Sequence, residues 1–217
     1  MNKCLINKGI ALFFFICFVL SCKSNHNKAL EQTIFSELIG KLVDSTISDY
    51  RRLVVPSLDD FDNEESKKGL YERIEIKKNK ELDPLVVFIH DTIGKINNGK
   101  EFFSKIKPHL EKNNFESILL ESKKSVNKIY IDHKLFKVDN TKYKLLSLIK
   151  KREEKYKTRT DLATYSFSRI YFNKEKTLGL FSLNIVYSGL NGYGFIVVVS
   201  KIDGDWEIEK LVEYWES

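Results

Sequence analysis

Apolar residues recur every four positions between residues 29 and 48. The repeat consists of Leu30, Ile34, Leu38 and Leu42. This spacing places the four side chains on one face of an α-helix. We therefore expect an amphipathic helix whose apolar face packs on the rest of the protein.

Two short segments after this helix have the composition of strands. Residues 71–76 read Tyr-Glu-Arg-Ile-Glu-Ile, and residues 85–89 read Leu-Val-Val-Phe-Ile. They predict a hairpin with its turn near residues 79–84. The acidic segment 56–66 before them predicts an exposed connector, because a calcium loop started at Asp60 lacks the glycine and the glutamate that such a loop requires.

The region from residue 97 to residue 160 gives weaker patterns. Residues 101–106 and 115–120 predict short helices interrupted near Pro108, although residues 118–120 fit a strand equally. Residues 143–156 contain many lysines and glutamates together with leucines. They predict a further helix.

The last fifty residues alternate apolar and polar positions between turn sequences. The predicted strands are residues 165–172, 177–187, 195–202 and 206–215. They predict a four-stranded antiparallel meander. In the last strand the alternation fails after Lys210, which indicates either a bulge or burial on both faces. The fold class predicted is α+β: an N-terminal helix, a mixed middle region and this C-terminal meander.

The first 21 residues predict a signal peptide. Lys3 and Lys8 precede an apolar run over residues 10–20, which is shorter than a membrane span. The run ends in Val19-Leu-Ser-Cys22, which resembles the lipobox of bacterial lipoproteins. That resemblance implies lipid attachment at Cys22, a membrane anchor and a signal containing residues 1–21.

The remaining cysteines fit the same interpretation. Cys4 and Cys17 both lie inside the signal, so the folded part offers no thiol for a disulfide or a metal site. We expect a polar tether over residues 22–28 and one α+β domain over residues 29–217. The polar tether lacks an acidic export cluster and the Asp of inner-membrane retention, so its resemblance to sorting signals implies an outer-membrane anchor facing the periplasm.

A second resemblance covers about the last sixty residues together with the lipobox. It is carried by Phe167-Ser-Arg-Ile-Tyr-Phe-Asn-Lys-Glu-Lys176, Gly192-Tyr-Gly194, Lys201-Ile-Asp-Gly-Asp-Trp-Glu-Ile208 and the terminal Trp215. These motifs resemble a group of uncharacterised Gram-negative lipoproteins. Members often carry cysteines around the GxG loop, and this chain has none there. The resemblance implies a cell-envelope location and no assigned activity.

Motifs that would indicate catalysis or a cofactor are weak. Gly189, Gly192 and Gly194 form GxxGxG, but a strand-like segment follows, so we expect a tight turn in which glycine supplies positive φ rather than a phosphate loop. His90 follows an apolar strand, yet neither GxSxG nor HExxH occurs. We expect no catalytic residue, no metal site and no cofactor.

Charge argues against a nucleic-acid partner. The formal net charge is +6, but only six of the 36 basic residues are arginine. Recognition of phosphates and base edges favours the planar fork of arginine over lysine.

These observations favour a non-catalytic binding or interaction module held at a membrane by its lipid anchor, with an envelope protein as a possible partner. Two alternatives stay open: an envelope hydrolase with a carboxylate or His90-based site, and an inhibitor or immunity-type protein. Asn191 and Tyr193 are the candidate partner-binding residues, since glycines expose a tyrosine at the mouth of a strand.

Overall fold

The computed structural model describes residues 28–47, 51, 53–96, 99–124, 127–149, 161–187 and 191–216. The predicted signal peptide and Cys22 lie outside these residues. The described chain begins with a helix over residues 28–46, which confirms the helix predicted from the apolar repeat. The other helical elements are η2 (Leu58–Phe61), α2 (Glu64–Asn79), α3 (Gly99–Ile106), η3 (Lys107–His109), α4 (Lys112–Ser122) and η4 (His133–Leu135).

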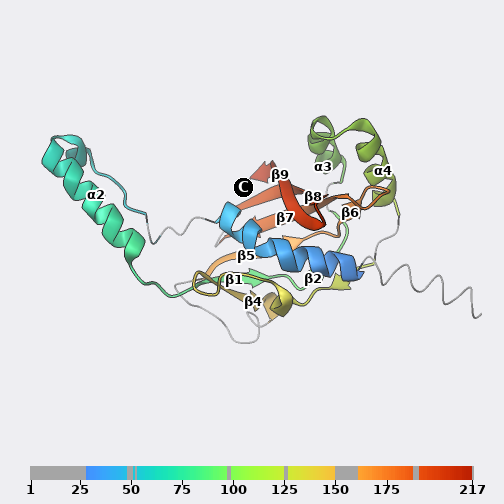
Figure 1. Cartoon of the computed structure of the whole chain (residues 1–217), viewed down its shortest axis with the longest axis horizontal. Helices are drawn as coiled ribbons and strands as arrows, with labels where there is room; N and C mark the ends of the chain where they lie inside the picture. The colour runs from blue at the N-terminus through green and yellow to red at the C-terminus, as the bar shows by residue number, and fades with distance from the viewer. Residues whose placement is uncertain are drawn as a thin grey trace, which may run out of the picture.

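A seven-stranded mixed sheet forms the centre of the protein (Figure 1). Its strands are β1 (Leu85–Ile89), β4 (Tyr143–Ser147), β5 (Asp161–Phe167), β6 (Tyr171–Phe172), β7 (Leu178–Val186), β8 (Gly192–Ile202) and β9 (Asp205–Glu216). The order is β4-β1-β5-β7-β8-β9, with β6 paired to β7. A separate two-stranded sheet pairs β2 (Thr92–Ile93) with β3 (Ile129–Tyr130).

The α+β class is confirmed, but the four-stranded sheet is a wrong prediction. The C-terminal strands are antiparallel as expected, and β1 and β4 extend the sheet in parallel with β5. All five residues of β1 are buried. A continuous apolar run is typical of a strand covered on both faces, yet it does not reveal which strands lie beside it.

Two element predictions in the middle region are corrected. Residues 71–76 belong to α2, not to a strand, and Asn63 caps this helix by accepting a hydrogen bond from Ser66 N at 2.9 Å. Residues 143–147 form β4, although a helix was predicted over 143–156. Pairing with β1 decided this outcome, because a short apolar run fits both periodicities; the part of that range after residue 149 lies outside the described residues.

Other predictions are confirmed. Residues 101–106 lie in α3, the break occurs at Pro108 in η3, and residues 115–120 are helical in α4. In β9 the pairing skips Tyr214, which is the predicted bulge.

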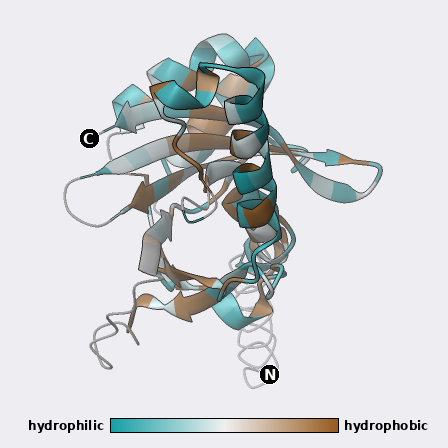
Figure 2. Cartoon of the chain, turned by 90° about the vertical axis from the view of Figure 1, so that its left-hand side faces the viewer, coloured by the Kyte–Doolittle hydropathy of each residue, from teal (hydrophilic) through white to brown (hydrophobic). Residues whose placement is uncertain are grey.

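Apolar clusters cover both faces of the sheet. One joins the helix over residues 28–46 to alternate residues such as Phe181, Leu183 and Val197. The other joins α3 and α4 to the intervening residues, including Leu180 and Ile196. In Figure 2 the helices mix hydrophilic and hydrophobic turns, whereas several strands are hydrophobic along much of their length.

A buried ion pair ties the first helix to the sheet. The Arg169 guanidinium donates to both carboxylate oxygens of Glu31 at 2.6–2.9 Å, and Arg169 Nη1 donates to the Asn127 carbonyl at 2.7 Å. The two residues of the pair, Glu31 and Arg169, are 1% and 9% exposed. Because each charge is compensated within the protein, this pair fixes the helix against the chain after β5.

Candidate functional site

Three polar side chains meet near the carboxyl ends of the parallel strands. Asp91 follows β1 by two residues, Ser147 is the last residue of β4, and His133 is the first residue of η4. Parallel strands of neighbouring segments end at the same edge of a sheet, and open α/β sheets bind ligands outside that edge. The topology therefore brings together residues that are up to 56 positions apart in the chain.

Asp91 is the centre of this cluster. Its Oδ2 accepts a short hydrogen bond from Ser147 Oγ, and its Oδ1 lies 3.2 Å from His133 Nδ1. The second contact is close, but neither Oδ1 nor Nδ1 has a hydrogen bond of good geometry within the described part of the chain. Asp91, His133 and Ser147 are 3%, 9% and 6% exposed.

This arrangement differs from that of a serine hydrolase. In a nucleophilic triad the histidine lies between the serine and the carboxylate and removes the serine proton. Here the carboxylate lies between the other two, and the Ser147 hydroxyl donates its hydrogen bond to Asp91. Ser147 thus positions Asp91 and is not an activated nucleophile.

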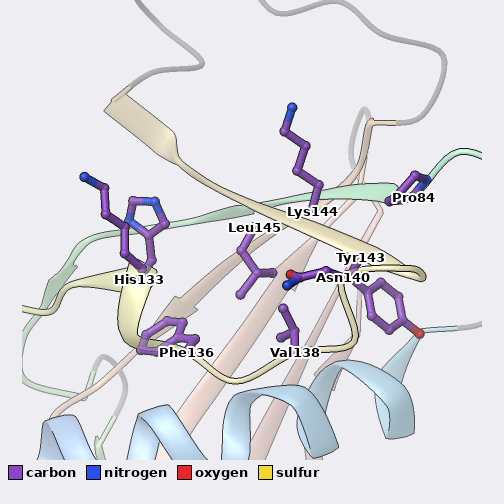
Figure 3. A pocket seen from close by; sticks show the side chains of 9 residues that line it. Pro84, His133, Phe136, Val138, Asn140, Tyr143, Lys144 and Leu145 are labelled. Atoms are coloured by element: carbon purple, nitrogen blue, oxygen red, sulfur yellow. The ribbon is translucent and has the colours of Figure 1, made fainter.

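His133 also lines a hollow of about 370 Å³ beside β4 (Figure 3). We call it the β4 hollow. Its apolar surface comes from Pro84, Phe136, Val138, Tyr143 and Leu145. Its polar lining consists of His133, Lys134, Asn140 and Lys144, and it contains no carboxylate. Both lysines are exposed, and no ion pair joins either of them to an acidic residue in the described segments.

A second hollow of about 260 Å³ lies on the α3 and α4 side of the sheet. Its lining includes Phe103, Leu119 and Tyr171 as well as Lys95, Lys100 and Lys123. It also combines apolar side chains with lysines, but it is smaller, its lining holds neither an amide nor an imidazole, and the buried Asp91 cluster does not adjoin it. It therefore provides an internal comparison.

His90, the histidine considered from the sequence, is exposed. Its Nδ1 accepts a weak bond of 3.4 Å from Thr92 N, and no hydrogen bond to a carboxylate is found for it in the described residues. The neighbour Asp91 and the distant His133 are the residues that the fold brings together. A polar residue directly after the buried strand was visible in the sequence, whereas nothing in the spacing of the histidines indicated His133.

The candidate loop residues lie at the start of β8. Asn191 is exposed, and its carbonyl accepts from Tyr187 N at 3.0 Å. The Tyr193 ring lies 6.0 Å from the Tyr187 ring, and the nearby Glu216 carboxylate raises the pKa of the Tyr193 hydroxyl. Residues 188–190 lie outside the described chain, so the role of this loop stays a prediction.

The two glycines of the GxG motif are required for a different physical reason from the one expected. Gly192 and Gly194 lie within β8, and positive φ is found among the described glycines only at Gly204. A Cβ on Gly192 would lie 3.0 Å from the Trp215 ring, and one on Gly194 would lie 1.8 Å from Trp215 Nε1. The glycines therefore make room for an indole ring rather than for a turn.

The acidic connector also has a structural role. Asp60 is buried, and its carboxylate receives a hydrogen bond of 2.5 Å from Arg73 and another of 2.8 Å from Ser57 N. Within the described segments, no three acidic, histidine or cysteine side chains are grouped as a metal site would require. No helix in the same segments has the length and apolar character needed to cross a membrane.

Comparison with known proteins adds no relative: no family model, no curated protein and no solved structure matches this chain.

Proposed function

We propose that this chain is a lipid-anchored protein of the bacterial cell envelope that binds, without converting it, an organic anion with an apolar body. The observation that supports the proposal is the lining of the β4 hollow, which pairs apolar side chains with lysine, amide and imidazole groups and holds no carboxylate. The anchor rests on the signal sequence that ends at Cys22. An outer-membrane location facing the periplasm is part of the same proposal.

The charge of the lining selects the ligand class. Lys134 and Lys144 bring positive charge to the edge of the hollow, where the Lys144 side chain points away from Leu145 (Figure 3). The Asn140 amide offers two N–H donors. A carboxylate or phosphate would find attractive groups at this rim, whereas a cation would be repelled. The apolar side chains beneath, with Phe136 and Tyr143 both 7% exposed, provide a surface for a hydrocarbon or aromatic body.

Binding is favoured over catalysis because the hollow holds no serine or cysteine nucleophile. Neither serine nor cysteine lines it, and the nearby Ser147 is buried and donates to Asp91. A bound anion would therefore meet groups that attract and orient it.

One observation favours hydrolysis as a second candidate. A carboxylate oxygen lies 3.2 Å from His133 Nδ1, and a modest change in angle would make this the contact that orients a histidine acting as a general base toward water. Under this alternative, hydrolysis of 4-nitrophenyl butyrate or 4-nitrophenyl phosphate should exceed background in the native chain and fall to background in His133→Gln. Equal rates for both proteins would reject hydrolysis by His133 and leave binding as the only proposed function.

The binding proposal is tested with 4-phenylbutyrate, an anion with an aromatic body, and with its neutral amide. Calorimetry on the chain in lipid nanodiscs should show saturable binding of the anion and at least about five-fold weaker binding of the amide. The Lys134→Glu/Lys144→Glu variant should lose about ten-fold in affinity, which corresponds to about 1.4 kcal/mol.

The second hollow supplies the matched control. Lys100→Glu/Lys123→Glu makes the same charge change at lysines that line it, so this variant should bind 4-phenylbutyrate like the native chain. Absence of saturable binding, or an equal loss in both variants, would contradict the proposal.

A further inference from the structure

Residues 53–79 form an arm that stands apart from the sheet (Figure 1). The arm consists of an extended segment over residues 53–57, then η2, then α2. The Asp60–Arg73 ion pair holds η2 on α2, and Lys77 Nζ donates to the Leu53 carbonyl at 2.6 Å. Leu70 of α2 is buried at 5% exposure. These contacts give the arm a defined internal structure.

The arm exposes many apolar side chains. Six large ones are more than half exposed: Leu53, Val55, Leu58, Phe61, Tyr71 and Ile76. Contiguous apolar groups on a projecting element mark interaction surfaces in soluble proteins. Exposure alone does not identify the partner, but the charges on α2 do.

Charges on α2 are arranged symmetrically about Tyr71 with opposite signs. Glu64 and Lys78 lie seven residues before and after it, and Lys67 and Glu75 lie four residues before and after it. Seven residues make about two helical turns and four make about one, so all five side chains follow one stripe of the helix. The Glu64 side chain is 90% exposed, and Tyr71 is 67% exposed. Within one copy Lys67 Nζ donates to Glu64 Oε1 at 2.7 Å.

We infer that this stripe binds the same stripe of a second copy of this chain. In an antiparallel pair about a two-fold axis at Tyr71, Glu64 of one copy meets Lys78 of the other, and Lys67 meets Glu75. Because Lys67 and Glu64 are bonded within one copy, these two side chains enter the pair as one ion pair that faces Lys78 and Glu75 of the other copy. The two tyrosines meet at the axis, and the interface is the same patch on both copies. A parallel pair would place like charges opposite each other, so the pattern selects the antiparallel arrangement.

The association is weak in dilute solution and strong on a membrane. Exposed ion pairs contribute at most about 1 kcal/mol each, and an aromatic pair adds about 0.5–1.5 kcal/mol. Confinement of anchored chains to one surface raises their effective concentration without any new contact. This inference does not depend on a ligand in the β4 hollow.

Cross-linking in membranes tests where the two-fold axis lies. Tyr71→Cys in the full chain should form a disulfide-linked dimer with a mild oxidant, and Glu72→Cys, about 100° away around the helix, should form at least about five-fold less. The native chain measures the background from its own cysteines. Equal cross-linking at both positions would overturn the inference. A second result would also overturn it: the thiol introduced by Tyr71→Cys does not react with a water-soluble maleimide, yet no dimer forms. Another partner or the lipid surface would then cover the arm.

Charge exchange tests the pairing itself. Glu64→Lys/Glu75→Lys and Lys67→Glu/Lys78→Glu should each lose self-association, whereas the two variants carrying different tags should co-purify when expressed together. The control Glu65→Lys/Glu72→Lys makes the same charge change on another stripe and should self-associate like the native chain. Failure of the two complementary variants to pair, with the helix content of each unchanged by circular dichroism, would refute the two-fold arrangement.

Discussion

The indole ring of Trp215 lies directly over the backbone of Gly194, where a Cβ would come within 1.8 Å of Trp215 Nε1. The same indole N–H donates to Asn184 Oδ1 at 2.9 Å, and the Tyr214 hydroxyl donates to that oxygen at 2.8 Å. One amide oxygen on β7 thus holds two aromatic side chains of β9 across β8. The space above Gly194 is what permits this arrangement.

Gly194→Ala should therefore destabilise the protein. The methyl group must displace the indole ring, and such overpacking costs about 1–3 kcal/mol. In a Trp215→Ala background the same substitution should cost less than about 1 kcal/mol, because the obstacle is gone. Gly69→Ala, where nothing lies within 4 Å of the added Cβ, is the control and should not lower the free energy of unfolding measured by urea denaturation.

Loss of one partner of the Glu31–Arg169 pair should be more costly. Arg169→Leu leaves the Glu31 carboxylate buried without compensation, so we expect a loss of about 3–5 kcal/mol in the free energy of unfolding. The double variant Glu31→Leu/Arg169→Leu should unfold less readily than Arg169→Leu. A double variant that is less stable than Arg169→Leu would contradict this explanation. It would show that the Glu31 carboxylate stabilises the fold even without Arg169.

Acidification should loosen the arm. The hydrogen bond from Arg73 lowers the pKa of the Asp60 carboxyl below its ordinary value of 3.8. An acid whose pKa is lowered by folding stabilises the folded form above the unfolded pKa and loses that contribution as the pH falls through the folded pKa. The protection factors for hydrogen exchange over residues 57–62, which correct for the pH dependence of exchange in an unfolded chain, should therefore decrease below pH 3.8, the ordinary pKa of the group.

Asp60→Asn should show the faster exchange already at neutral pH, while Asp62→Asn, a change at an exposed neighbour, should exchange like the native chain. Unchanged protection in Asp60→Asn would mean that the ion pair does not hold η2 on α2.

Local patterns in the sequence predicted what local physics determines. The four-residue repeat of Leu30 to Leu42 predicted the first helix, and the alternation in the last fifty residues predicted the antiparallel pairing found there. The strands that pair with β1 could not be predicted. All residues from Leu85 to Ile89 are buried, so the sequence of β1 does not favour one neighbouring strand over another. His133 was missed for the same reason: its contact with Asp91 exists only because η4 lies beside the end of β1.

Two missed features did leave signals. Asn63 followed by Glu64 and Glu65, with Lys77 and Lys78 further on, is the pattern of a capped helix, and it outweighs the apparent alternation of residues 71–76. The two glycines of the GxG motif and the tryptophan two residues before the last one are also visible, but only the register of β8 and β9 shows that they meet.

The proposed lipid anchor predicts a simple labelling result. Cells that express the native chain and grow on an alkyne analogue of palmitate should label it, and Cys22→Ser should abolish the label and leave the signal peptide uncleaved. Cys17→Ser changes a cysteine inside the signal and should be labelled normally. Label retained on Cys22→Ser would contradict lipid attachment at Cys22.

The most direct test of the proposed ligand site is a methyl NMR titration of the chain in lipid nanodiscs with 4-phenylbutyrate. The probes are the methyl groups of Val138 and Leu145, which line the β4 hollow, and those of Leu119, which lines the second hollow. A ligand site in the β4 hollow predicts saturable shifts at Val138 and Leu145 and none at Leu119. Shifts confined to Leu119, or no saturable shift at any of the three residues, would contradict it.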